Sequence, residues 1–114
     1  MNYLINYDLL GVGRTSDEYE RLGGAIGLID PTTTPALYSA WLARSDADSV
    51  VISCFLQKYV NDPTRLMVTE ITNNWWASGL SAEAVEWLAL NCPNTVVVSR
   101  ERAFEMARER MRLL

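Results

Sequence analysis

A chain of 114 residues with 49% apolar side chains can bury the core of one domain without disulfides or a structural metal. Its formal net charge is -4 and it has no histidine, which removes the commonest general base and the commonest zinc ligand. It has no stretch of about 18 uncharged apolar residues and no signal-peptide pattern, so we expect a soluble, cytoplasmic protein without membrane contact.

The first predicted element is a strand that covers the apolar run from Tyr3 to Leu10. Short apolar runs bounded by glycine are typical of buried strands, so this strand should lie centrally in a sheet. Alternation places Asp8 beside Asn6 on one face, at the exit of the strand. If the protein performs chemistry, we expect Asp8 at its centre. The structural alternative is that Asp8 ends the strand by accepting hydrogen bonds from the turn at 11–13.

A helix is predicted from about residue 16, with Thr15 or Ser16 as its cap. Its apolar side chains recur at helical spacing and should face the sheet. These side chains are Tyr19, Leu22, Ile26 and Ile29. Gly23, Gly24 and Gly27 interrupt the segment, and each costs roughly 1 kcal/mol relative to alanine. They indicate close packing against the sheet or a weak helix, since their spacing does not match a phosphate-binding loop.

Extended structure is predicted at 32–35, as an edge strand or its approach, and continues as a strand over 36–44. A second helix should start at Ser45 or Asp46 and stop at 61–63. Its apolar stripe comprises Val51, Ile52, Phe55, Leu56, Tyr59 and Val60. Asp46 and Asp48 have a spacing seen in calcium loops but lack the glycine and the later glutamate of such loops, which favours helix capping instead.

A further clear strand covers 65–72, and its Glu70 is either a second acid on the sheet or the partner of Arg44 or Arg65 in an ion pair. The order is then strand, helix, extended pair or long bent strand, helix, strand. This order predicts an α+β fold with a ferredoxin-like split βαβ antiparallel sheet and two helices on one face. The opposite face of that sheet is left without cover.

Three segments in this order resemble the Cas-two-like family. These are small proteins related to the ferredoxin-fold subunit of the CRISPR adaptation machinery, and they are more distantly similar to the virulence-associated D toxins. The segments are 3–9 with Asp8 near its end, 37–42 before an Asp/Ser-rich helix start, and 62–68. The resemblance covers residues 1–80, which we interpret as a ferredoxin-like core.

The resemblance implies a homodimer that packs sheet against sheet. In that family the aspartate at the end of the first strand lies near the dimer axis, where two copies can hold Mg²⁺. Asp8 occupies the matching position, which makes it the candidate catalytic and metal-binding residue. Some members are metal-dependent nucleases, and others are scaffolds whose aspartate is dispensable. This chain departs from the family in its acidic body and in the addition that follows Leu80.

That addition, 81–114, is predicted to pack on the core or on a dimer partner, as a helix after Ser81, a strand at 95–98 and a final helix capped by Ser99. The final helix has an apolar stripe. The stripe comprises Ala103, Phe104, Ala107, Met111 and Leu114. Before the addition, Trp75 and Trp76 could stack on bases, or they could pack their loop onto the sheet or a partner.

Half of the basic residues lie in the last fifteen positions and are the candidate contacts to nucleic acid or a partner. They are Arg100, Arg102, Arg108, Arg110 and Arg112. Residues 1–99 carry five basic against eleven acidic residues, a net charge of -6, which suits tight nucleic-acid binding poorly. Three interleaved glutamates favour the simpler interpretation of the final helix as a solvated face.

Two functions follow from these patterns. The first is a non-catalytic dimeric scaffold for a protein or nucleic-acid complex, since the chain has no complete catalytic set. The alternative is a Mg²⁺-dependent endonuclease that acts on RNA or DNA through Asp8 paired across the dimer axis. Cys54 and Cys92 lack metal-ligand spacing and are expected to be packing residues.

Overall fold

The computed structural model describes residues 1–9, 16–37, 39–60, 64–93 and 99–112. Within these residues the chain forms four strands and four helices of an α+β fold. Several predicted features lie outside the described residues: the turn at 11–13, the Thr15 cap, the helix stop at 61–63, the strand at 95–98 and Leu114 of the final stripe.

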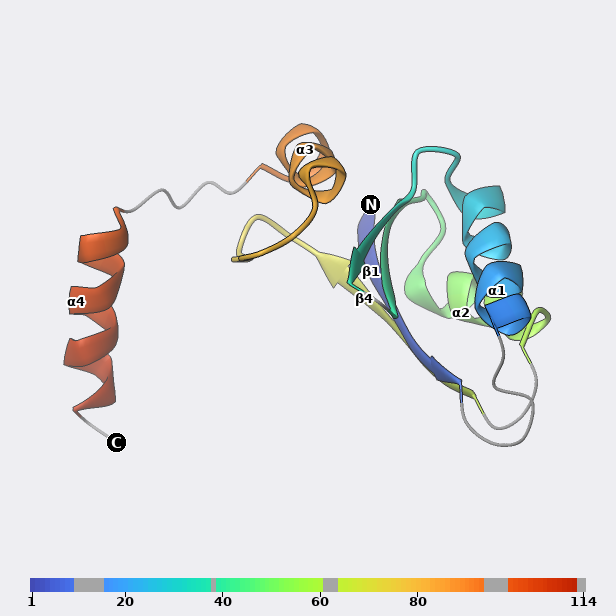
Figure 1. Cartoon of the computed structure of the whole chain (residues 1–114), viewed down its shortest axis with the longest axis horizontal. Helices are drawn as coiled ribbons and strands as arrows, with labels where there is room; N and C mark the ends of the chain where they lie inside the picture. The colour runs from blue at the N-terminus through green and yellow to red at the C-terminus, as the bar shows by residue number, and fades with distance from the viewer. Residues whose placement is uncertain (10–15, 38, 61–63, 94–98, 113–114) are drawn as a thin grey trace.

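The strands form one antiparallel sheet in the order β2-β3-β1-β4 (Figure 1). They are β1 (Asn2–Leu9), β2 (Thr34–Leu37), β3 (Ala40–Arg44) and β4 (Thr64–Ile71). β1 is central, as its apolar run predicts. The prediction of one strand over 36–44 is wrong, because the chain turns at Ser39 and β2 and β3 pair with each other. β2 is an edge strand, which suits Pro35 because proline cannot donate to a central ladder.

Two helices, α1 (Ser16–Ile29) and α2 (Ser49–Gln57), cover one face of the sheet (Figure 1). The α1 stripe packs as predicted, and its Leu22 and Ile26 are fully buried. The α2 stripe is confirmed only in part, because Val51 is 55% exposed. The helices thus supply one side of the larger hydrophobic core.

The cap of α2 is Asp48, whose Oδ1 accepts a hydrogen bond from the Val51 backbone N–H at 3.0 Å. The prediction of Ser45 or Asp46 as cap is therefore wrong. Ser45 lies earlier in the connection, where its Oγ accepts a hydrogen bond from the Ala47 N–H at 3.1 Å. Of Asp46 and Asp48, the two aspartates with calcium-loop spacing, Asp48 is thus a helix cap.

The other side of this core is made by Tyr3, Ile5 and Tyr7 of β1, all at most 5% exposed. The Tyr3 hydroxyl donates to the Ala47 carbonyl oxygen at 2.7 Å, which ties the central strand to the connection before α2. The Trp41 indole N–H donates to the Tyr7 hydroxyl at 2.9 Å. These bonds satisfy polar atoms that would otherwise be costly to bury.

A third helix, α3 (Ala82–Asn91), covers part of the opposite face of the sheet. It is capped by Ser81, as predicted. Its contact with the sheet forms a second hydrophobic cluster. The buried members are Leu42, Ala84, Trp87, Leu88 and Cys92, with Leu4 and Ile71 packed against them.

This packing corrects the expectation that the second face is bare. The apolar half of that face is covered within the same chain. Val85 of α3 is 55% exposed, because the helix turns the side with Ala84, Trp87 and Leu88 to the sheet.

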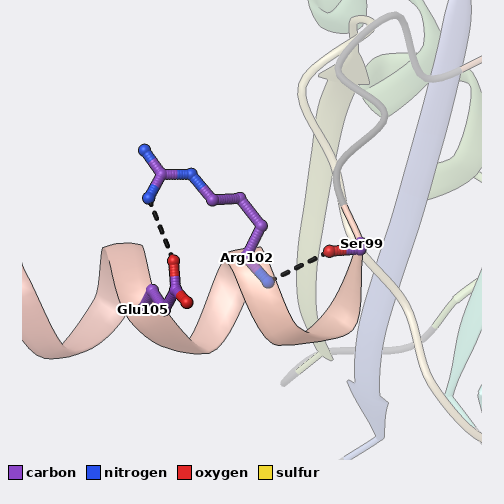
Figure 2. Close-up of polar contacts among 3 residues, drawn as sticks. All are labelled: Ser99, Arg102 and Glu105. Atoms are coloured by element: carbon purple, nitrogen blue, oxygen red, sulfur yellow. Dashed lines mark hydrogen bonds and ion pairs between the residues drawn. The ribbon is translucent and has the colours of Figure 1, made fainter.

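The last helix, α4 (Arg100–Met111), buries none of its residues and stands apart from the sheet and from α3 (Figure 1). Ser99 caps it as predicted, with its Oγ accepting from the Arg102 N–H at 3.1 Å (Figure 2). The apolar side chains of Phe104 and Met111 remain 56% and 64% exposed. The helix is thus formed locally but has no packed surface of its own.

Candidate functional site

Asp8 lies at the part of the second sheet face that α3 leaves uncovered. It is half-buried, shares its face with Asn6, and is the register partner of Arg65 in β4. We call this region the open sheet end and define it by Asn6, Asp8, Arg65, Met67 and Thr69, which alternation places on one face. A shallow depression of about 220 Å³ lies along Asn6 to Asp8 and Arg65 to Met67. The carboxylate is therefore within reach of solvent.

The open sheet end is a weak metal site within one chain. Mg²⁺ prefers several oxygen ligands, whereas the cross-strand neighbour of Asp8 is the cationic Arg65. In the part of the chain that the structure describes, no three Asp, Glu or Cys side chains gather as metal ligands would. The simplest role of Asp8 is an opposite-charge cross-strand neighbour of Arg65.

The open sheet end is also mostly polar. Its large apolar side chain is Met67, which is 64% exposed, while Arg65 and Thr69 are exposed polar residues. A sheet-against-sheet dimer would need a contiguous apolar surface here. The apolar residues on this side of the sheet, Leu4 and Leu42 among them, lie under α3.

The two tryptophans of the predicted stacking pair differ. Trp75 is half-buried against the α3 cluster, and its indole N–H donates to the Cys92 carbonyl oxygen at 2.7 Å. Trp76 is 84% exposed. Trp75 therefore holds its loop to the end of α3, and Trp76 alone of the two offers a free aromatic face.

The five candidate arginines all lie on or beside α4. The Arg102 guanidinium pairs with the Glu105 carboxylate at 3.2 Å (Figure 2), and both side chains are more than half exposed. The Arg100 guanidinium lies 5.5 Å from the centre of the Phe104 ring. Arg108 and Arg110 lie in the last turn, where cations interact favourably with the helix dipole. The structure does not bring these arginines to Asp8.

Glu70 lies opposite Tyr3 in the sheet register, on the face that α1 and α2 cover. It therefore does not pair with Arg44 or Arg65, which lie on the other face. Burial raises the pKa of the Tyr3 hydroxyl, and the negative charges of Glu70 and Asp48 raise it further.

The cysteines have different surroundings. Cys92 is buried as expected, and burial raises the pKa of its thiol, so the reactive thiolate is suppressed. The prediction that Cys54 is a packing residue is wrong, because it lies on the exposed side of α2. Neither cysteine belongs to a metal-ligand group of described residues.

One hollow of the molecule was not apparent from the sequence patterns. It is a groove of about 1010 Å³ between α3, the α1–β2 connection and the β3–α2 connection. We call it the α3 groove. The exposed acids Asp46, Glu83 and Glu86 line it, together with Leu90, which is 76% exposed. The spacing of Glu83, Glu86 and Leu90 on one side of a helix is the signal that was available in the sequence.

Asp30 holds one wall of the α3 groove. It is 5% exposed, and its Oδ1 accepts hydrogen bonds from the Thr32 N–H at 2.9 Å and from the Thr32 hydroxyl at 2.6 Å. Its Oδ2 accepts from the Arg44 backbone N–H at 2.8 Å. Because this carboxylate is saturated by donors, it joins the two connections and is a structural residue.

Comparisons of the chain with protein-family models, with curated proteins and with solved structures gave no significant match. Among the helices that the structure describes, none is long and apolar enough to cross a bilayer.

Proposed function

We propose that this chain is a cytoplasmic, non-catalytic dimeric interaction module that serves as a scaffold for a protein or nucleic-acid complex. The observation that carries the proposal is α4, an amphipathic helix that buries none of its residues and exposes Phe104 and Met111. An exposed apolar stripe rimmed by charge is the usual mark of an interaction site. Helices of this kind bind by laying the apolar face into a groove.

We further propose that residues 1–80 adopt the ferredoxin-like arrangement and are related to the Cas-two-like family. Support comes from the element order, with two crossover helices, and from the strand order β2-β3-β1-β4. Both helices lie on one face, as that arrangement requires. α3 then occupies part of the face through which the dimer was expected to form, so the dimer contact includes the 81–114 extension.

The second candidate is a Mg²⁺-dependent endonuclease with two copies of Asp8 across a dimer axis. The observation in its favour is that Asp8 lies on the open sheet end, where α3 does not cover it. Two carboxylates and bound waters could then hold the ion and activate a water. Arg65 beside each carboxylate opposes this reading, because a fixed cation competes with the metal.

The two candidates are separated by a cleavage assay together with sedimentation. Labelled RNA and DNA are incubated with the protein in Mg²⁺ or EDTA, and with the Asp8→Ala variant. We expect no cleavage in any sample and a dimer at micromolar protein concentration. Cleavage that disappears both with EDTA and with Asp8→Ala would support the endonuclease, and a 12.8 kDa species alone would remove the dimeric module.

A further inference from the structure

The charge of the chain is divided between its body and its last helix. Residues 1–99 have a net charge of -6, whereas residues 100–114 carry five arginines against three glutamates. The cationic segment is α4, which has no buried residue. Because opposite potentials favour association, the body of a second copy is an electrostatically suitable partner for this helix.

Helical spacing places two arginines at the edges of the α4 stripe. With about 100° per residue, Arg108 projects about 40° beyond Phe104 at one edge of the stripe, and Arg110 projects about 20° beyond Ala103 at the other edge. Arg102 lies on the opposite side of the helix, where it pairs with Glu105 (Figure 2). A surface that binds the stripe would therefore need an apolar floor and acidic edges.

The α3 groove provides one exposed leucine and three exposed acids in a lining that is otherwise largely polar. Leu90 is 76% exposed in it, Trp87 contributes to its lining, and Glu83 and Glu86 stand one helical turn apart along the same side of α3. Asp46 adds a third exposed acid from the opposite wall. The lining includes one basic residue, Arg44.

The lengths also agree. α4 has 12 residues and α3 has 10, so at 1.5 Å per residue they span about 18 Å and about 15 Å. One helix can thus lie along the other over its whole length. Figure 1 shows α4 well separated from α3 of the same chain.

We propose that α4 of one copy docks into the α3 groove of a second copy, and that the exchange is reciprocal. Phe104 and Met111 then lie against Leu90, with Arg108 and Arg110 beside Glu83 and Glu86. The exchange is isologous, because each copy gives one helix and receives one. The inference rests on the proposed dimeric module and identifies both its partner and its contact.

A charge-exchange experiment tests the proposal. One variant reverses the charge of the groove by Glu83→Lys with Glu86→Lys. The other reverses the charge at the edges of the α4 stripe by Arg108→Glu with Arg110→Glu. We expect each variant alone to have a dimer dissociation constant raised by roughly tenfold or more, because like charges meet. An equimolar mixture of the two should restore the dimer, since each groove then meets a helix of opposite charge.

Matched controls carry the same changes of charge at other places. Asp17→Lys with Glu20→Lys alters exposed acids of α1, and Arg102→Glu with Arg112→Glu alters the other side of α4. Both controls should sediment as the unaltered protein does. Circular dichroism of every variant establishes that it is folded.

Three outcomes would overturn the inference. If the unaltered protein is a dimer and both charge-reversed variants remain dimers, the dimer forms through a different contact. The proposed dimeric module is then retained, and only the exchange of α4 is refuted. If the mixture does not recover the dimer, α4 is not exchanged between copies. If the unaltered protein is a monomer, the dimeric module and the exchange fail together.

Discussion

Tyr3 links the central strand to the connection before α2, and its buried hydroxyl makes the stability depend on pH. Burial, with Glu70 and Asp48, raises its pKa above the ordinary 10.0. The stability contributed by the protonated hydroxyl is therefore fully present below pH 10.0 and is lost as pH rises through that value toward the folded-state pKa.

We expect the unfolding free energy to fall above this pH and the fall to be shallower in Tyr3→Phe, measured by urea unfolding over a pH series. At neutral pH the variant should be less stable, because the Ala47 carbonyl oxygen loses its donor. Equal slopes in the two proteins would show that Tyr3 is not the titrating group.

Two adjacent glycines of α1 should respond in opposite directions to alanine. A Cβ on Gly23 would lie 3.0 Å from Cζ2 of Trp41, whereas one on Gly24 would meet open space. We expect Gly24→Ala to stabilise by about 0.5–1 kcal/mol through helix propensity. Gly23→Ala should destabilise by about 1 kcal/mol, because the cost of overpacking against Trp41 exceeds that gain.

The two alanine variants have equal side chains, so each is the control for the other in urea unfolding. Stabilisation by both would mean that Trp41 moves away at little cost. The sequence left open whether these glycines indicate close packing or a weak helix. The structure answers differently for each position: Gly23 packs closely, and Gly24 is replaceable.

At the scale of elements, sequence patterns predict the strands better than the surfaces that cover them. Alternation groups Tyr3 with Ile5 on one face of β1, because the period of two follows from the pleat. The structure shows that this is the core face, where Val68 of β4 also lies. Alternation also places Leu4 on the other face of β1, where apolar side chains such as Leu4 and Leu42 must be buried by another element. It does not state whether a helix of the same chain or a second copy provides it, and here α3 does so.

The α3 groove was missed for a related reason. It is built by three segments far apart in the chain, so its acids meet only after α3 has docked on the sheet. The position of Asp8 at the exit of β1 was predictable because it depends on one strand alone.

The docking of α3 can be measured through Cys92. With Cys54→Ala as background, the remaining thiol is buried at the C-terminal end of α3, in the cluster between α3 and the sheet, and its pKa is raised by burial. We expect Cys92 to react with an alkylating reagent much more slowly than Cys54 does in a Cys92→Ala background. The rate should increase at denaturant concentrations that undock α3, because exposure then requires only local opening.

Equal rates for the two thiols in water would contradict the packing of α3 on the sheet. Trp75→Phe provides a further check, because it removes the hydrogen bond from the indole to the Cys92 carbonyl oxygen. It should accelerate the labelling of Cys92. Trp76→Phe, at a neighbouring exposed side chain, should leave the rate unchanged.

For the whole molecule, the decisive question is how α4 is stabilised. Isolated helices shorter than about 12–15 residues are marginally stable in water, because the free-energy cost of nucleation is not offset by the hydrogen bonds of a few turns. α4 has 12 residues, and its Arg102–Glu105 ion pair joins exposed side chains, a contact worth at most about 1 kcal/mol. Its Ser99 cap adds a stabilisation of about 1 kcal/mol.

The helicity of residues 100–111 should therefore depend on protein concentration. By hydrogen exchange, we expect weak protection of the α4 amides in dilute protein and strong protection once dimers form. Docking then buries the apolar stripe, which stabilises the helix in addition to its cap and its ion pair. The α1 amides serve as an internal reference, since α1 is packed against the sheet in each chain and should be protected at both concentrations. The Arg108→Glu, Arg110→Glu protein should keep weak α4 protection at both concentrations. Strong protection of α4 in dilute monomer would instead mean that the helix finds its contact within its own chain, because only an intramolecular contact is independent of concentration.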